Sequence, residues 1–353
     1  MPNRTSPLSP ARPTTTVGTR PSRTAALLGG PAPILTAAVL WGTTGTASSL
    51  APAGAPAAAI GCAGLALGGI LLLLTSRSAS RSASRSASRS AARGASRRAS
   101  PTAAATAAAS PGARSLVAAA TGRERWLLLL GALAVAGYPV TFYPAVARTG
   151  VAVATVIALG SAPVFAGLLA RLTGQSRPTA RWTVATATAV LGCTLLVLGP
   201  ELSGRSTPTD LTGVALAACG GLSYAVYSLI GGRLITHGHP SGEVMGVLFG
   251  AAGLIVLPLV LLTDTHWLTT VRGAAVAVYL ALFTVFLAYR LFGHGLRRTP
   301  ASVATSLTLA EPAVAAVLGV TVLDERLPLA SWSGLTVLTL ALVLLTFPSG
   351  RAR

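Results

Sequence analysis

The sequence predicts an all-α integral membrane protein with ten transmembrane helices. Only 10% of the 353 residues are charged, 52% are hydrophobic, and the mean hydropathy is +0.67. A soluble globular protein carries about 25% charged residues. The chain also contains apolar runs of about 20 residues, the length of a membrane-spanning helix. These runs are continuous rather than alternating, which disfavours a β-barrel.

Ten such runs can be counted, and each predicts one span. The second and fourth are rich in Ala and Gly, so a count of nine stays open, and the internal repeat described below favours ten. The predicted spans are approximately 30–50, 53–75, 126–146, 150–172, 181–199, 210–231, 243–263, 273–295, 301–323 and 331–348.

Two segments outside the spans are predicted to be disordered. Residues 1–24 are rich in Pro, Ser, Thr and Arg. In the long loop 76–122, Arg recurs at every fourth position from Arg77 to Arg97, which on a helix would stack like charges on one face. This Arg/Ser segment is either a tether to anionic membrane lipid or a repeat expansion without function.

The arginines predict the orientation of the chain in the plasma membrane. All basic residues apart from His are Arg, and the formal charge is +19. With a cytoplasmic N-terminus, 22 arginines fall on the inside and four on the outside. Both termini are therefore predicted to be cytoplasmic. Because the arginines lie in tails and loops between apolar spans, we expect no nucleic-acid partner.

The chain contains an internal repeat. Residues 142–159 and 292–309 align at an offset of 150 with seven identities in 18 positions, among them Phe142 with Phe292. The offset of 150 residues contains five predicted spans. Because five is an odd number, the second copy enters the membrane from the opposite face. The predicted repeats are 25–199 and 209–348. Such an inverted five-plus-five repeat is characteristic of secondary transporters.

The same alignment pairs two Gly/Pro-interrupted apolar stretches, "LGSAPVF" at 159–165 and "LAEPAVA" at 309–315. In inverted-repeat transporters, such stretches mark the binding site near the middle of the membrane. We therefore predict helix-break hinges at Gly160, Pro163 and Pro312, with the prolines freeing the carbonyls of Leu159 and Thr308. The alternative is a packed proline kink without a ligand.

Several segments resemble the EamA-type branch of the drug/metabolite transporter superfamily. The resemblance rests on "AVLWGTTGTASS" (38–49), "TGVAVATVIALGSAPVFAGLLA" (149–170), "LSYAVYSLIGGRL" (222–234) and "TPASVATSLTLAEPAVAAVLGVTVLDERL" (299–327). It implies ten helices in two EamA-type repeats and export of small metabolites, amino acids or drug-like compounds by alternating access. Proton antiport is the coupling that it implies. The chain departs from the family at Gln175 or Ser176, where the first repeat lacks the glutamate that the second has at Glu325.

Charged residues inside the predicted spans are candidates for substrate binding and coupling, because such groups are costly in a bilayer. They are Glu311 in span 9 and Arg290 in span 8, with His294 one turn beyond. Glu311 is a proton carrier, a counter-charge for a cationic or amino substrate, or a structural group paired with Arg290 or bonded to a neighbouring helix.

Aromatic side chains at similar depth predict a stacking or cation–π surface around the substrate. The candidates are Trp41, Tyr138, Phe142, Tyr224, Tyr227 and Tyr289. Tyr224 and Tyr227 are three residues apart and share one helix face. The alternative for each is ordinary packing.

Enzymatic chemistry is not predicted. The chain contains no Lys and no P-loop, and its three cysteines lack metal-ligand spacing. The "HGH" of the loop at His237 and His239, near Glu243, is more typical of a solvated turn than of a metal site. We therefore expect no cofactor or metal, and a small-molecule substrate, protons and membrane lipid as partners. The alternatives to a secondary transporter are a channel or a non-transporting membrane protein, such as a lipid-active enzyme or assembly factor.

Overall fold

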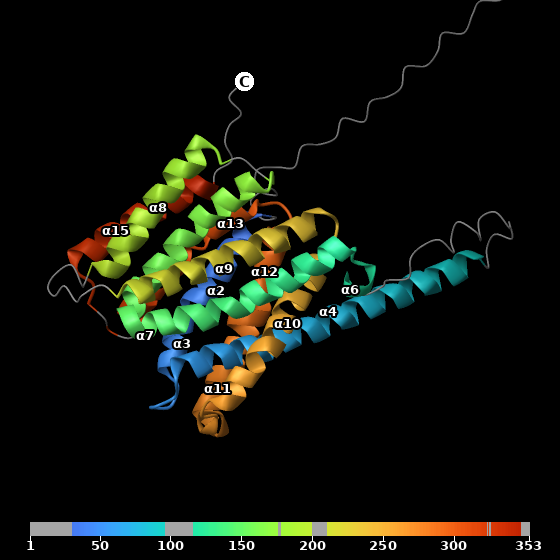
Figure 1. Ribbon diagram of the computed structural model, residues 1–353, viewed down its shortest axis with the longest axis horizontal. Helices are drawn as coiled ribbons and strands as arrows, with labels where there is room; N and C mark the ends of the chain where they lie inside the picture. Colours follow the sequence, from blue (N-terminus) through green and yellow to red (C-terminus); the bar gives the residue numbers. More distant parts are fainter. Residues whose placement is uncertain are drawn as a thin grey trace, which may run out of the picture.

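The computed structural model describes residues 30–95, 116–175, 178–199, 210–322, 324 and 326–346. Within these ranges the regular structure is helical, and most helices lie side by side in one bundle (Figure 1). The predicted tail at 1–24 lies outside the described residues. Large apolar side chains such as Leu133, Val164 and Leu340 remain half exposed on the outer face of the bundle, as expected of a surface that contacts lipid.

The helices include two irregular elements, a 3₁₀ turn (η2) and a π-helix (η3). In chain order the elements are α2 (Pro31–Gly42), α3 (Thr44–Ser49), α4 (Ala57–Ala95), α6 (Leu116–Ala119), α7 (Gly122–Leu172), α8 (Ala180–Leu198), α9 (Leu211–Thr236), α10 (Ser241–Leu262), η2 (His266–Thr269), α11 (Val271–Tyr279), η3 (Leu280–Leu287), α12 (Ala288–Gly295), α13 (Ala301–Leu307), α14 (Ala310–Val322) and α15 (Leu329–Thr346).

The predicted spans correspond closely to these helices. Nine helical stretches in the described part of the chain are long and apolar enough to cross a membrane. The tenth predicted span is α2 followed by α3, which Thr43 divides into two short helices. Predicted spans 3 and 4 are continuous in α7 apart from Gly150, whose φ of 83° reverses the chain direction. The all-helical prediction is confirmed, and its count of ten is approximately supported.

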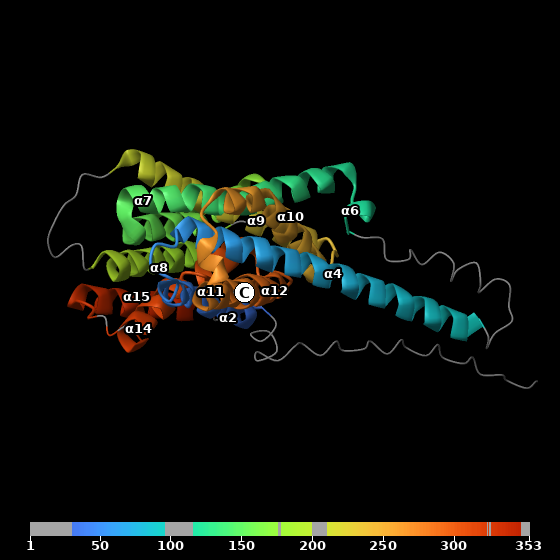
Figure 2. The ribbon, with the colours of Figure 1, turned by 90° about the horizontal axis from the view of Figure 1, so that it is seen from below.

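The helix α4 is much longer than one span. Its 39 residues correspond to about 59 Å, roughly twice the hydrocarbon thickness, and one end projects beyond the other helices (Figures 1 and 2). The predicted disorder of the Arg/Ser segment is therefore wrong for residues 76–95. The apolar half of α4 supplies a helix that is already nucleated. The following Ala, Arg and Ser residues only extend it, which is favourable enough to outweigh the small repulsion between like charges.

Polar caps fix the ends of the two helices that pack most extensively, α7 and α9. Thr121 and Glu124 form a capping box at the start of α7. Asp210 caps α9 and forms a 3.2 Å ion pair with Arg148 at the turn inside α7. The backbone N–H of Gly213, followed by Arg148, lowers the pKa of the Asp210 carboxyl from its ordinary value.

Several pairs of helices approach so closely that only glycine fits between them, and α4–α10 and α8–α15 are two of these pairs. Between α4 and α10, a side chain at Gly69 would collide with the carbonyl of Phe249. Between α8 and α15, a Cβ at Gly192 would lie 2.5 Å from the backbone nitrogen of Leu338, and one at Gly334 would lie 2.7 Å from the Gly192 carbonyl. Small residues at such positions allow close backbone packing in membranes. We refer to these contacts as the α4–α10 seam and the α8–α15 seam.

Candidate functional site

Three irregular stretches of helix lie close together in the bundle, and the one in span 1 contacts the other two. Span 1 breaks at Thr43, between α2 and α3. Span 9 breaks at Thr308 and Leu309, between α13 and α14. Span 8 passes through the π-helix η3 before α12. Inside a membrane, irregular backbone is tolerated only against protein or a wet cavity, and π-helices are frequent at functional sites.

The break in span 9 differs from the predicted one. The carbonyl of Thr308, which we expected Pro312 to leave free, accepts a 2.9 Å hydrogen bond from the backbone N–H of Glu311. The helix α13 ends at Leu307, where Thr and Ser hydroxyls already bond to backbone carbonyls of this segment, as Thr305 does to Ser302 at 3.0 Å. Such local bonds compete with the helical ladder.

The corresponding break in the first repeat is absent. The helix α7 continues through Gly160 and Pro163, and Gly150 is its only residue with non-helical backbone angles. The prediction of helix-break hinges at Gly160 and Pro163 is therefore wrong. Gly160 is close to Val190 of α8, from which a Cβ would lie 3.3 Å away, so it serves close packing.

Trp41 connects span 1 to the π-helix. Its indole Nε1 donates a 2.8 Å hydrogen bond to the carbonyl of Thr284, inside η3. One turn away, the hydroxyl of Tyr279 donates to Thr43 Oγ1 at 2.9 Å. The two irregular stretches therefore satisfy part of each other's polar groups, which fixes α2 against span 8.

Aromatic side chains gather between these irregular stretches and form a continuous cluster. The Trp41 ring centroid lies 6.4 Å from that of Tyr224 and 4.9 Å from that of Tyr289, while Tyr224 stacks on Tyr227 at 5.2 Å. We define the aromatic cluster as Trp41, Tyr138, Phe142, Tyr224, Tyr227, Phe249, Tyr289 and Phe292, which come from α2, α7, α9, α10 and α12. The predicted aromatics are thus brought together.

Hydrogen bonds orient the tyrosines of the cluster. The hydroxyl of Tyr224 donates to Thr308 Oγ1 at 2.8 Å, so α9 is bonded directly to the break in span 9. The Tyr227 and Tyr289 hydroxyls lie 3.3 Å apart. Both Tyr224 and Tyr227 are only 4% exposed. A buried hydroxyl without a partner is costly, so these bonds keep the rings in one arrangement.

Glu311 lies in the first turn of α14, at the edge of this cluster. It is close enough to Tyr138, Tyr224 and Tyr289 to interact with them electrostatically. Its side chain is half buried. No cation lies within salt-bridge distance of its carboxylate among the described residues, and no side-chain hydrogen bond fixes it there. The site therefore offers a carboxylate that can accept a proton or an incoming cation.

Arg290 and His294 do not belong to this site. Both are exposed on the outer face of α12, whereas Ala288 and Phe292 face inward. The guanidinium carbon of Arg290 lies 5.5 Å from the ring centroid of Phe286, in the π-helix η3 of the same span. The predicted approach of Arg290 to Glu311 is therefore wrong, and so is the interpretation of Glu311 as its structural partner.

Two members of the aromatic cluster, Phe249 and Phe292, and the role of Thr308 were not predicted. Phe292 could have been found, because the internal alignment pairs it with Phe142, which was a candidate. Phe249 carried no signal, since a phenylalanine in an apolar run is indistinguishable from packing. The role of Thr308 depends on the helix break, which no periodicity predicts.

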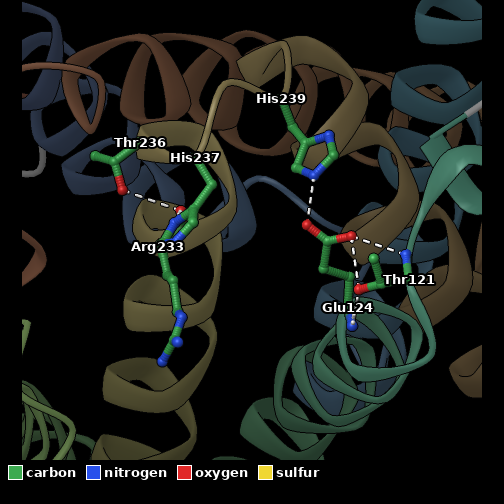
Figure 3. Close-up of polar contacts among 6 residues, drawn as sticks. All are labelled: Thr121, Glu124, Arg233, Thr236, His237 and His239. Atoms are coloured by element: carbon green, nitrogen blue, oxygen red, sulfur yellow. Dashed lines mark hydrogen bonds and ion pairs between the residues drawn. The ribbon is translucent and has the colours of Figure 1, made fainter.

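A second group of polar side chains lies where α7 begins and α9 ends (Figure 3). Nε2 of His239 is 2.9 Å from Oε1 of Glu124, and the other carboxylate oxygen accepts from the backbone N–H and hydroxyl of Thr121. Nδ1 of His237 lies 2.6 Å from the carbonyl of Arg233. The "HGH" turn is thus tied to two helices. Among the described residues, no group of three or more His, Cys, Asp or Glu could hold a metal ion.

Comparisons with known proteins define the class of molecule. The chain is 34% identical over 316 residues to an uncharacterised transporter, YwfM of Bacillus subtilis, and the match covers 89% of this chain and 92% of that protein. It is 30% identical to the uncharacterised inner membrane transporter YedA of Escherichia coli, over 54% of this chain and 60% of that protein. With the threonine/homoserine exporter RhtA of Salmonella typhimurium it shares 35% identity, over 44% of this chain and 50% of that protein.

A protein of known crystal structure has the same fold, with a TM-score of 0.66 and 19% identity over 92% of this chain and 96% of its own. Fold and relatives together define a multi-pass transporter of the cell membrane. Residues 211–347 match the EamA-like transporter family. The chain belongs to this family, as its resemblance indicated.

Proposed function

We propose that the protein is a secondary active transporter that exports small molecules bearing a protonated amine, in exchange for protons at Glu311. The observation that carries this proposal is the position of Glu311. It is a carboxylate without a fixed cation among the described residues, at the edge of an aromatic cluster and beside a broken membrane helix.

The chemistry of the site favours a cation over an anion. The faces of Trp and Tyr attract ammonium groups, and a nearby carboxylate supplies the counter-charge. Tyr138 and Tyr289 lie close to Glu311, and the Trp41 ring centroid lies 4.9 Å from that of Tyr289. Arg290, the cation of span 8, faces away. An anionic substrate would therefore meet a like charge and, among the described residues of this part of the bundle, no cation to compensate it.

Proton coupling follows if proton and substrate compete for one carboxylate. A protonated Glu311 cannot attract an ammonium group, so binding of either releases the other, and alternating exposure then exchanges them across the membrane. The export direction is supported by the similarity to RhtA, a threonine/homoserine exporter, and the cytoplasmic position of both termini by the distribution of the arginines.

Flux into proteoliposomes tests the proposal. We would compare a panel of amines with neutral analogues of matched shape, with and without a pH gradient, for the wild type, Glu311→Gln and Glu311→Asp. Glu311→Gln should abolish gradient-driven amine flux, and Glu311→Asp should retain part of it. Asp264→Asn is the matched control, because Asp264 accepts only a local backbone bond from His266.

The outcomes separate the two roles of the carboxylate. If Glu311→Gln loses gradient-driven flux but keeps amine exchange in the absence of a gradient, Glu311 carries protons without binding the amine. If it loses both, Glu311 serves both roles as proposed. Full gradient-driven amine flux in Glu311→Gln would refute the proposal.

A further inference from the structure

A cavity of about 360 Å³ lies at the end of the bundle where α7 and α9 end and where α12 connects to α13. Its volume falls within the range of small-ligand pockets. Its lining includes Gln175 of the turn after α7, Arg233 in the last turn of α9, and Arg297, Arg298 and Thr299 of the connection. By the arginine distribution, this is the predicted cytoplasmic end.

The charge of this cavity is uncompensated. Three arginines line it, and among the described residues no Asp or Glu does. Within the described ranges, no carboxylate lies within salt-bridge distance of Arg233, Arg297 or Arg298. Arginine side chains are positively charged at physiological pH, so three positive charges line the same cavity. Such an arrangement is unfavourable unless water, salt or a bound anion offsets it.

The wall of the cavity also carries an unused hydrogen-bonding group. Thr299 is only 6% exposed, and no side-chain hydrogen bond engages its hydroxyl within the described part of the chain. Its backbone N–H is already committed, at 3.0 Å, to the carbonyl of Gly295. Among the described residues, the fully buried unpartnered atoms belong to Ser228, Trp267 and Ser331, so the Thr299 hydroxyl is accessible on a residue that lines the cavity and can donate to a ligand or water there.

Gln175 is neutral where the other repeat is charged. The internal alignment brings it within one position of Glu325. A carboxylate at Gln175 would neutralise part of the arginine charge, whereas an amide can donate a hydrogen bond to an anion. His237, which also lines the cavity, is fixed by its bond to the Arg233 carbonyl (Figure 3).

From this cavity we infer a binding site for a phosphate group, separate from the site at Glu311. Guanidinium groups match phosphate oxygens in geometry and charge, and the Thr299 hydroxyl supplies a further donor. The phosphate can belong to an anionic lipid headgroup of the adjoining leaflet or to a soluble phosphate compound. Basic pockets between membrane helices bind lipid headgroups in this way.

The test measures binding by the full-length protein, independently of transport. In the first arm, protein in phosphatidylcholine nanodiscs is titrated with inorganic phosphate by isothermal titration calorimetry. In the second arm, nanodiscs that also contain phosphatidylglycerol are analysed by native mass spectrometry for retained lipid, and the phosphate titration is repeated in them. Retained phosphatidylglycerol that prevents phosphate binding identifies the lipid as the source. Phosphate binding that phosphatidylglycerol leaves unchanged identifies a soluble compound.

Three variants localise the site. Arg297→Gln/Arg298→Gln should weaken phosphate or lipid binding at least about tenfold. Gln175→Glu, which adds one negative charge at nearly constant size, should weaken it about fivefold. Arg272→Gln is the control, since Arg272 is an exposed arginine in the first turn of α11, at the other end of span 8.

Elution volume and melting temperature establish that each variant is folded. If the double variant Arg297→Gln/Arg298→Gln does not fold, Gln175→Glu alone tests the site. The inference is wrong if the wild type binds neither phosphate nor phosphatidylglycerol. It is equally wrong if Gln175→Glu and the folded double variant bind as tightly as Arg272→Gln.

Discussion

The close approach of α2 to α14 predicts that Gly42→Ala damages the protein. A Cβ at Gly42 would lie 2.6 Å from Val314 Cβ and 2.9 Å from the Glu311 carbonyl oxygen. Carbon atoms in contact prefer about 3.5–4.0 Å, so the helices must separate by about 1 Å. Because one of the colliding atoms belongs to the backbone, we place the cost near 3 kcal/mol, the upper part of the range for overpacking.

Alanine also favours helix over glycine by about 1 kcal/mol, which offsets part of this cost. The net loss of stability for Gly42→Ala is therefore about 2 kcal/mol. Gly45→Ala, one turn away in α3, is the matched control, because a Cβ there has nothing within 4 Å. Gly45→Ala should be neutral or slightly stabilising, which separates the two variants by about 2–3 kcal/mol.

Apparent melting temperatures of the purified variants in detergent measure this separation, and proteoliposome flux measures its effect on transport. Gly42→Ala should melt below the wild type and transport poorly, because its neighbour Trp41 moves relative to Glu311. Gly45→Ala should match or exceed the wild type in both assays. Equal melting temperatures for the two alanine variants would show that α2 and α14 are not in contact as described.

Three further predictions follow from single contacts. A double-mutant cycle of Tyr224→Phe and Thr308→Val, measured by unfolding, should give a coupling of about 0.5–1.5 kcal/mol, and additivity would argue against their hydrogen bond. Trp41→Phe should cost about 1–3 kcal/mol beyond any packing loss, because it leaves the Thr284 carbonyl without its indole donor; a smaller loss would mean that water replaces the indole. Asp210→Asn should lower stability at pH 7, and the difference from wild type should shrink as the pH falls below about 4. The pKa of Asp210 is lowered in the folded state, so the ionised carboxylate stabilises the protein above the ordinary carboxyl pKa, and this contribution is lost in acid. A stability difference that does not change with pH would contradict this.

The spans could be predicted because the bilayer imposes length and apolarity on each helix separately. The faces of the helices could not be predicted in the same way. A pairing of Arg290 with Glu311 was considered because both are charged residues inside consecutive spans, but Arg290 lies two residues from both Ala288 and Phe292, which puts it on the opposite face of α12. The π-helix just before α12 changes the rotation per residue, so a period of 3.6 carried through span 8 would not have corrected this.

The prolines illustrate a second limit. Pro163 and Pro312 align in sequence, yet α7 remains continuous while span 9 breaks. The difference lies in the preceding residues. Before Pro312, the hydroxyls of Thr305, Ser306 and Thr308 all bond to nearby carbonyls, whereas before Pro163 only Ser161 does so. A proline therefore permits a break, and its neighbours decide whether one forms.

The two glycine seams constrain how a transport cycle can move. In the predicted repeats, α4 and α10 are the second helices and α8 and α15 the fifth, so each seam fastens a helix of one half to its counterpart in the other. Rocking the halves as independent bodies would separate backbones that touch at Gly69 and Gly192. The seams would instead act as fixed pivots, together with the α7–α9 contact where a Cβ at Gly221 would lie 2.5 Å from the Ala158 carbonyl oxygen, and bending would fall at α2–α3, α13–α14 and span 8. A disulfide across either seam should then leave the protein fully active, because the two helices that it joins do not separate during the transport cycle.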